Sequence, residues 1–188
     1  MLPLSYHYTK KIFVLKYLIL STLLFSCKSE FEKRNNEINR IVFATGGCYG
    51  SCPIQVIDID SSLSYKYQGL ANSNYIGFYE GNITQGFWDT LNIKLENINY
   101  KDLDSIYDHS VDDLSTEVYI YYNNGVKHID AQSSSLPEEV FNAYNWFLMS
   151  IKNLKMNRTN KKFTFETVTE KPIPMPDFST TDNKNNHF

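Results

Sequence analysis

The amino-acid sequence predicts an α+β fold, in which a mostly antiparallel sheet of two hairpins plus a first strand carries two helices packed on one side. Apolar and polar residues alternate in residues 55–67 and 116–130, which is typical of strands that bury one face. Apolar residues recur every three or four positions in residues 87–98 and 140–154, which indicates amphipathic helices. The order strand, hairpin, helix, hairpin, helix lacks the regular alternation that a parallel sheet requires.

Composition and charge limit the classes of protein to which the chain can belong. Of its 188 residues, 42% are hydrophobic and 21% are charged, which suits one folded domain with a polar tail. The first 26 residues hold three lysines and no acidic residue, so the remainder carries a formal charge near -3 - 3 = -6. A chain without a basic face cannot neutralise phosphates, and we therefore expect no nucleic-acid partner.

The N-terminus has the three parts of an export signal. Three lysines lie before a short apolar stretch, residues 17–25. A small residue, Ser26, follows this stretch and directly precedes Cys27. Such a stretch is too short to cross the roughly 30 Å hydrocarbon layer as a helix. The pattern resembles the lipobox of bacterial lipoproteins and predicts a signal peptide over residues 1–26, with lipid on Cys27 as the membrane anchor. An uncleaved signal anchor, or secretion with cleavage elsewhere, is the alternative.

We predict that residues 27–38, which follow the signal peptide and are mostly polar, form a tether that holds the domain off the membrane. The charged stretch 28–33 resembles lipoproteins of the Bacteroidetes type, whose surface-exported members carry an acidic stretch after the lipidated cysteine. The resemblance implies a cell-envelope protein, at the outer rather than the inner membrane, on its periplasmic or its surface side. We predict a single domain over residues 39–155 and an extended, partly disordered tail over residues 156–188.

The first half of the domain is predicted to consist of strands. Residues 40–46 form an apolar run that stops at a glycine pair, which predicts a first strand, and residues 48–53 follow as a loop. Residues 55–60 and 63–67 form the first hairpin, and residues 75–79 are expected to add a strand. The side chains expected to face the core are Ile57, Ile59, Leu63, Tyr65 and Tyr67.

A helix and a second hairpin are predicted next. The helix should begin after Thr84, whose hydroxyl can cap the first turn, and it should bury one apolar stripe. That stripe comprises Phe87, Trp88, Leu91, Leu95 and Ile98. Residues 116–122 and 126–130 predict the hairpin, with Asn124-Gly125 supplying the positive φ angles of a tight turn.

A second helix is predicted over residues 137–154, with Ser135 and Glu138 as a capping box at its start. Its apolar stripe comprises Val140, Tyr144, Phe147, Leu148, Ile151 and Leu154. Beyond the helix, residues 163–169 are predicted as an edge strand. Residues 171–178 should be extended, and the last ten residues should be disordered.

The densest motif of the chain is Gly46-Gly47-Cys48-Tyr49-Gly50-Ser51-Cys52-Pro53. If lipid occupies Cys27, then Cys48 and Cys52 remain as a pair, and an oxidising envelope favours a disulfide between them. The three glycines permit unusual backbone angles, and Pro53 stiffens the entry into the next strand. A disulfide across so short a loop stabilises a fold by about 2 kcal/mol in the chain-entropy model.

The same two cysteines suggest an alternative in thiol-redox or metal chemistry. Two thiols at this spacing, followed by proline, resemble the copper-binding motif of Sco-type chaperones and thioredoxin-like redox pairs. In those proteins the cysteine segment opens a helix, which lowers a thiol pKa, whereas here a strand is predicted to follow. A third metal ligand would have to be His109 or His128, and neither has a histidine partner at ligand spacing. We therefore predict no metal and no cofactor.

Carboxylates offer weaker candidates. Asp58 and Asp60 share one strand face, and five aspartates precede the second hairpin, namely Asp102, Asp104, Asp108, Asp112 and Asp113. Calcium is one possibility, but the acidic stretch lacks the glycine and glutamate of an EF-hand loop. Neither a phosphate-binding loop nor a Gly-x-Ser-x-Gly elbow occurs. A hydrolase that uses Asp58, Asp60 or Asp113 stays open, because carboxylate pairs are assembled in space.

The chain also resembles an uncharacterised family of bacterial envelope proteins, the domain of unknown function numbered 6438, over roughly residues 39–155. The matching features are residues 46–53, Tyr67-Gln68-Gly69, Trp88-x-x-Leu91, Asp113 and Pro137. The loop is the specific part of the pattern. Ser61-Ser62 stands where an Asp-Gly-type turn is usual. The resemblance implies the domain limits and the envelope address, and it implies no activity.

A binding role is the hypothesis that the sequence favours. Tyrosine suits interfaces because its body is apolar and its tip polar, and five strand tyrosines are candidates for an exposed binding face. They are Tyr65, Tyr67, Tyr119, Tyr121 and Tyr122. The alternative is that half of them fill the core and half cover a sheet edge. We expect a non-enzymatic, lipid-anchored module that binds an unknown protein or small ligand through its sheet face.

Overall fold

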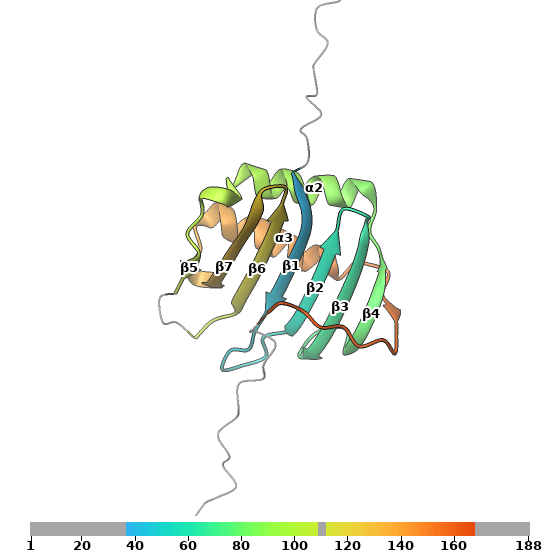
Figure 1. The fold of residues 1–188 in the computed structure, drawn as a ribbon. Helices are drawn as coiled ribbons and strands as arrows, with labels where there is room; N and C mark the ends of the chain where they lie inside the picture. Colours follow the sequence, from blue (N-terminus) through green and yellow to red (C-terminus); the bar gives the residue numbers. More distant parts are fainter. Residues whose placement is uncertain (1–36, 109–111, 168–188) are drawn as a thin grey trace, which may run out of the picture. The chain divides into compact units, whose positions relative to one another are not determined.

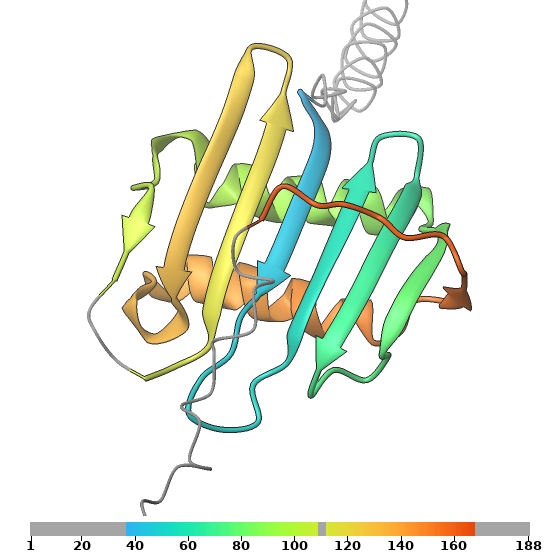
Figure 2. The ribbon, with the colours of Figure 1, turned by 60° about the horizontal axis from the view of Figure 1, so that its bottom comes forward.

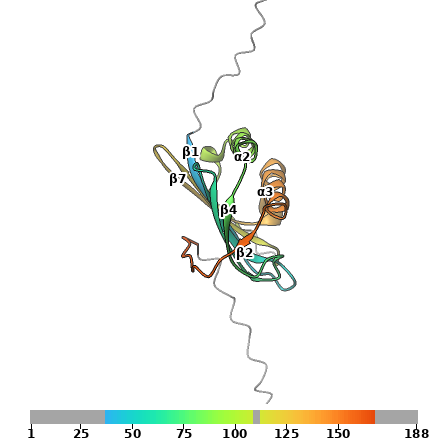
Figure 3. The ribbon, with the colours of Figure 1, turned by 90° about the vertical axis from the view of Figure 1, so that its right-hand side faces the viewer.

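The computed structural model describes residues 37–108 and 112–167. These residues form one eight-stranded sheet (Figure 1). Two helices cover one of its faces, and Figure 3 shows both on the same side. The predicted α+β fold is confirmed. The predicted signal peptide, Cys27, His109 and the chain beyond residue 167 lie outside the described residues.

Within the described residues, none of the helices is both long enough and apolar enough to cross a membrane.

In chain order the strands are β1 (Ile38–Thr45), β2 (Ile54–Asp60), β3 (Ser64–Ala71), β4 (Gly77–Asn82), β5 (Ile106–Tyr107), β6 (Ser115–Tyr122), β7 (Gly125–Gln132) and β8 (Asn157–Arg158). They lie side by side in the order β5-β7-β6-β1-β2-β3-β4-β8. The helices are α2 (Gln85–Asn97) and α3 (Glu138–Ile151), and two short 3-10 turns are η1 (Tyr100–Asp102) and η2 (Ser133–Ser135).

β1 lies in the interior of the sheet and pairs antiparallel with β2 on one side and with β6 on the other. The hairpins β2–β3 and β6–β7 form as predicted. The strand predicted for residues 75–79 exists as β4, but it begins at Gly77 and continues to Asn82. The two-residue strands β5 and β8 were not predicted; β5 runs parallel to β7, and β8 pairs with β4.

The turn of the second hairpin differs from the prediction. Tyr122 pairs with Gly125, so Asn123 and Asn124 make the turn, and neither they nor Gly125 adopt a positive φ. Gly125 has a different role, because a Cβ atom there would lie 3.2 Å from the Tyr122 hydroxyl oxygen. A positive φ of 67° occurs instead in the first hairpin, at Leu63, which follows the Ser61-Ser62 turn.

Helix α2 begins where its cap was predicted. The Thr84 hydroxyl accepts a hydrogen bond of 3.1 Å from the Phe87 amide, which satisfies one of the unpaired donors of the first turn. Trp88, Leu91 and Leu95 are buried against the sheet, as the helical spacing requires.

Helix α3 begins with Pro137 as its cap residue, and the predicted capping box is wrong. Ser135 belongs to η2, where the Leu136 amide bonds back to the Ser133 carbonyl, so Ser135 lies too early in the chain to cap the helix. The helix ends at Ile151 rather than Leu154. Residues 153 and 154 continue as turns that bond to the carbonyls of Ser150 and Ile151.

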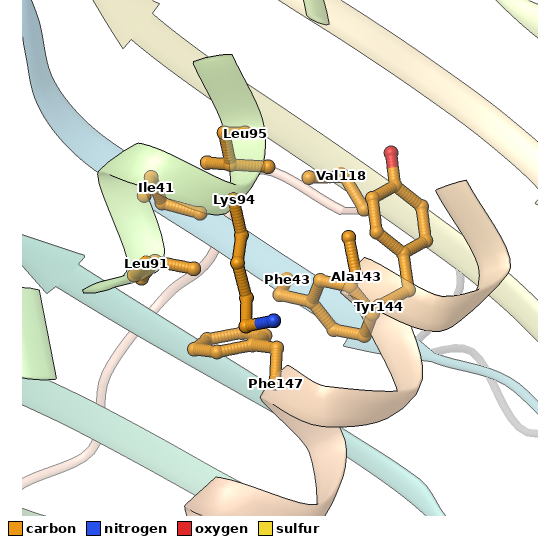
Figure 4. Close-up of a pocket in the computed structure, with 9 residues that line it drawn as sticks. All are labelled: Ile41, Phe43, Leu91, Lys94, Leu95, Val118, Ala143, Tyr144 and Phe147. Atoms are coloured by element: carbon orange, nitrogen blue, oxygen red, sulfur yellow. The ribbon is translucent and has the colours of Figure 1, made fainter. Parts of the chain in front are cut away.

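The main core lies between the sheet and the two helices. Figure 4 shows aromatic and aliphatic side chains from β1, β6, α2 and α3 converging there, with Lys94 among them. The Phe43 ring meets the rings of Tyr144 and Phe147 edge-on, at centroid distances of 5.3 and 5.0 Å. The space left between these side chains is about 10 Å³, which is too small for any ligand. This layer is therefore a packed core and not a binding cavity.

The opposite, outer face of the sheet is crossed by the C-terminal strap, which we define as residues 159–167. The strap follows β8 and runs across several strands on the side away from the helices (Figures 2 and 3). The edge strand predicted for residues 163–169 is wrong over residues 163–167, which form no strand. Phe165 is instead buried in an apolar strip of the outer face, made of Val42, Ala44 and Val56.

Candidate functional site

The loop of residues 46–53 joins β1 to β2 at one end of the sheet. Cys48 and Cys52 form a disulfide in it, with Cα atoms 5.6 Å apart, so the predicted pairing is confirmed. The loop is attached to the sheet at both ends. The Thr45 hydroxyl donates to the Pro53 carbonyl at 2.6 Å, and the Gly46 amide donates to the Ser115 carbonyl at 2.9 Å.

Tyr49 lies at the tip of this loop and is 96% exposed. Its side chain is free in solvent, but its backbone is held in place. The Tyr49 amide donates to the Asp112 carboxylate at 2.7 Å, and the next amide, of Gly50, donates to the Cys48 carbonyl at 2.7 Å. A fixed backbone that presents an aromatic side chain to solvent is a typical contact element of protein interfaces, because little entropy is lost on binding.

An open pocket of about 610 Å³ lies beside the loop. The two are neighbours because Asp112 and Ser115, which bond to the loop, flank pocket residues in the sequence. The described lining residues come from the start of β6, from η2 and from α3. They are Asp113, Leu114, Thr116, Ser133, Ser134, Leu136, Glu138, Phe141, Tyr144, Asn145 and Leu148.

The lining has an apolar part and a hydrogen-bonding part. Leu114, Leu136 and Leu148 supply apolar surface, and Phe141 on α3 is 42% exposed. Asp113 is held rigidly, since its two carboxylate oxygens accept hydrogen bonds of 2.7 Å from the amides of Leu114 and Ser134. Such a mixture of apolar walls and a few fixed polar groups is typical of a ligand-binding site.

The sequence of this domain, including the loop, matches a known family model over residues 39–151. The chain belongs to the family described as a domain of unknown function (DUF6438). No curated protein matches the chain. The matched region runs from β1 to the end of α3, so it contains the loop and the pocket, whereas β8 and the strap follow it.

The DUF6438 domain does not bring the predicted carboxylates together as a catalytic pair. Asp58 makes a two-pronged ion pair with Arg40, at 2.9 and 3.1 Å, on the outer face. Asp60 holds the first hairpin turn through hydrogen bonds from Ser62 and Ser64. Asp113 orders the backbone beside the pocket. Each of the three therefore has a structural partner of its own.

The pKa of Asp60 reflects this turn. Partial burial opposes ionisation, but the hydrogen bonds from Ser62 and Ser64 outweigh it and lower the pKa of Asp60 below its ordinary value. Among the described residues, no three His, Cys, Asp or Glu side chains form a group that could hold a metal ion. The two cysteines of the DUF6438 loop are bonded to each other.

The five strand tyrosines do not form one exposed face, so the prediction of a tyrosine-lined binding face is wrong, whereas the prediction that Tyr65 and Tyr67 face the core is confirmed. Tyr65 and Tyr67 are buried on the helix side, where their hydroxyls donate to the Lys155 carbonyl and to Gln55. Burial raises the pKa of Tyr65 to about 12. Tyr122 lies on the same side, against the Tyr100 ring. Tyr119 and Tyr121 lie on the outer face with the strap.

Sequence reasoning missed a buried carboxylate on the outer face. Glu117 is 1% exposed, and its Oε1 accepts a hydrogen bond of 2.8 Å from Tyr119 and lies 3.0 Å from His128 Nε2. Its other oxygen accepts a hydrogen bond from Thr167 of the strap. His128, which the sequence offered as a metal ligand, is thus the partner of Glu117. The available signal was the alternation in β6, which places Glu117 and Tyr119 opposite the core-facing Val118.

Proposed function

We propose that this chain is a lipid-anchored protein of the bacterial cell envelope, and that its DUF6438 domain is a non-enzymatic binding module. The binding site in this proposal is the disulfide loop together with the pocket beside it. One observation carries the proposal: Tyr49, at 96% exposure, is presented on a backbone that the disulfide and Asp112 hold beside a pocket of about 610 Å³.

Binding is favoured over catalysis by the chemistry of the lining residues. Among the described residues that line the pocket, none is a histidine or a cysteine. Two carboxylates, Asp113 and Glu138, line it, and both oxygens of Asp113 are engaged by backbone amides. Acyl or glycosyl transfer would need a nucleophile with a neighbouring base, or two carboxylates facing a substrate. Apolar walls with fixed polar groups serve recognition without such a pair.

The anchor rests on the sequence alone. Ser26 directly before Cys27, after a short apolar stretch, supports lipidation of Cys27, and the charged stretch 28–33 supports an outer-membrane address of the Bacteroidetes type. Growth with an alkyne-bearing palmitate analogue tests this. We expect label on the natural chain and none on Cys27→Ala. Equal labelling of both chains would contradict lipidation at Cys27 and would leave the binding site unaffected.

Photo-crosslinking in intact cells tests the binding site. A photoreactive phenylalanine analogue at position 49 should form a discrete adduct, because Tyr49 lies at the proposed contact. The same analogue at Val126, which is 50% exposed near the turn of the β6–β7 hairpin, is the control and should form none. Adducts of equal yield at both positions, or none at position 49, would contradict the proposal.

A pocket variant separates the contribution of the loop from that of the pocket. Ser134 lines the pocket and is exposed, so Ser134→Trp should fill the space and reduce the adduct at position 49. Asn142→Trp places the same bulk on an exposed position of α3 outside the lining. If both tryptophan variants lower the adduct equally, the pocket has no specific part in binding.

The loop also supports a second candidate, a thiol-redox or copper-type site at Cys48 and Cys52. Both cysteines are only half-buried, so a reductant can reach the disulfide, although β2 and not a helix follows the pair. Thiol titration and intact mass of the purified chain, with and without mild reductant and copper or zinc, test this. Easy reduction or tight uptake of one metal ion would favour it; a bridge that resists mild reduction and binds no metal would exclude it.

A further inference from the structure

The strap is anchored first at the β4 edge of the sheet. The Thr159 amide donates to the Phe78 carbonyl at 3.0 Å, and Lys161 makes an ion pair with Glu80 at 3.0 Å. The Phe163 ring then meets the Phe78 ring edge-on at a centroid distance of 5.8 Å. These contacts place the strap on the outer face as it leaves β4.

The middle of the strap fills an apolar strip at the centre of the outer face. Phe165 is 7% exposed and packs on Val42 and Ala44 of β1 and on Val56 of β2, all of which are buried. Phe163 and Phe165 lie on the same side of the extended segment, with ring centroids 6.2 Å apart. The residue between them, Thr164, is exposed.

The last described residues of the strap are held by polar side chains. Glu166 lies 3.7 Å from Arg40 and accepts a hydrogen bond from Tyr121. Thr167 donates to the buried Glu117. Residues 165–167 therefore contact three different kinds of partner. Phe165 packs on an apolar strip, Glu166 lies near a cation, and Thr167 bonds to a carboxylate.

The strap is held by its side chains more than by its backbone. Between the described residues of the strap and the sheet, one backbone hydrogen bond occurs, from Thr159, and residues 159–167 form no strand. The receiving surface lies within the region that matches the DUF6438 family, whereas the strap lies outside it. A family domain thus carries, on its outer face, an appended segment that is bound in the manner of a peptide ligand.

We propose that the outer face of the sheet is a peptide-recognition surface, and that the strap occupies it in the free chain. The partner is a protein with an extended segment of the pattern aromatic-x-aromatic-acidic, matching Phe163-x-Phe165-Glu166. The first aromatic ring of the partner would lie beside Phe78, where Phe163 lies in the free chain. The second ring would pack on the apolar strip that includes Val42, and the acidic side chain would pair with Arg40. Because the strap is tethered, its effective concentration is high, and a partner must compete with it.

A peptide titration of the full chain tests this surface, which is separate from the disulfide loop. The probe is a fluorescent synthetic peptide with the sequence of residues 159–167, and the receptor is the Phe163→Ala/Phe165→Ala double variant. We expect saturable binding to the double variant and binding at least tenfold weaker to the natural chain, whose own strap competes. The matched control is the same peptide with alanine at both phenylalanine positions, which should not bind.

Circular dichroism of the double variant comes first. A folded double variant that does not bind the peptide would overturn the proposal, and so would a double variant that fails to fold, since the strap would then be part of the domain core. A second measurement uses the natural chain with isotope-labelled phenylalanine, in which excess unlabelled peptide should displace the strap and shift the ring NMR signals of the chain's own Phe163 and Phe165. Unchanged signals at millimolar peptide would also overturn it.

Discussion

The two faces of the sheet are covered in different ways. On the helix side, α2 and α3 bury a continuous layer of aliphatic and aromatic side chains around Phe43. On the outer side, an extended strap covers a small apolar strip, and a buried carboxylate with polar partners lies next to it. The helices can cover their face because each supplies a row of apolar residues, whereas the strap supplies only alternate side chains.

The difference between the faces indicates separate tasks. The helix-side layer around Phe43 leaves a space of only about 10 Å³, so this part accounts for stability, whereas the pocket beside the loop lies at the border of the layer, next to Tyr144 and Leu148. The outer face combines an apolar strip with Arg40 and Glu117, which suits the recognition of a particular segment more than general burial. The helix side should therefore respond to mutation with a loss of folding, and the outer side with smaller and more local losses.

The largest effect is expected for Phe43→Ala on the helix side. Phe43 is 3% exposed and meets two aromatic rings, so truncation leaves a cavity and should lower the free energy of unfolding by about 3–5 kcal/mol. Urea denaturation measures this. Phe141→Ala, on the exposed side of α3, is the control and should change little. Equal losses in the two variants would contradict a core centred on Phe43.

A smaller loss is expected for Phe165→Ala on the outer face. Its side chain is buried against the apolar strip, and removing that burial should cost about 1.5–3 kcal/mol. Thr164→Ala changes the exposed neighbour and should be neutral in the same urea titration. A loss as large as that of Phe43→Ala would show that the two faces contribute alike and would remove the distinction between them.

Glu117→Gln probes the polar part of the outer face. Glutamine keeps an oxygen to accept from Tyr119 but removes the charge that faces His128. The His128 side chain is 42% exposed, so solvent screens the pair, and the loss should be about 1 kcal/mol. A loss above about 3 kcal/mol would instead indicate an ion pair that behaves as fully buried. Thermal unfolding near neutral pH measures the difference.

The smallest effect is a gain in stability from Asp130→Asn. Partial desolvation, followed by repulsion from Glu117, raises the pKa of Asp130, so the folded state holds this proton more tightly than the unfolded state. That contribution is fully present below the unfolded pKa and is lost as the pH rises through the folded pKa. Asparagine removes the charge, so melting temperatures should rise slightly at pH 7 and agree with the natural chain near pH 3. A loss at pH 7 would contradict the sign.

Local periodicity was enough to predict most of the fold. The hairpins, β1 and both helices follow from alternation and from helical spacing, because one face of each element must be apolar to pack. The Thr84 cap and the Cys48–Cys52 disulfide were also predicted, since both depend on residues close in sequence. Features that depend on neighbours only a few residues apart are those that a single sequence can reveal.

Other local signals gave wrong predictions when a different contact prevailed. The box of Ser135 and Glu138 does not form because η2 uses the residues before Pro137. Asn124-Gly125 does not supply positive φ angles, because Gly125 belongs to the strand ladder and lies against the ring of Tyr122. In both places the same residue types fit two conformations, and the surrounding fold decides between them.

The candidate sites were harder to predict from the sequence than the elements of the fold. The loop was visible in the sequence because its glycines and cysteines are contiguous, but the pocket beside it is assembled from three separate elements. Alternation in residues 163–167 looked like a strand edge, and only the tertiary structure places Phe165 on Val42 and Thr167 on Glu117. Contacts between residues so far apart in the chain produce no periodic pattern in the sequence, so the sequence alone could not predict them.

The position of β1 inside the sheet has a consequence for folding order. β1 pairs with β2, which follows it directly, and with β6, from which it is separated by β2, β3, β4, α2 and β5. During synthesis, the first strand therefore stays unpaired on one side until almost the whole sheet has been made. Closing so long a loop slows folding, because the loop-closure entropy has to be lost before the contacts between β1 and β6 can form.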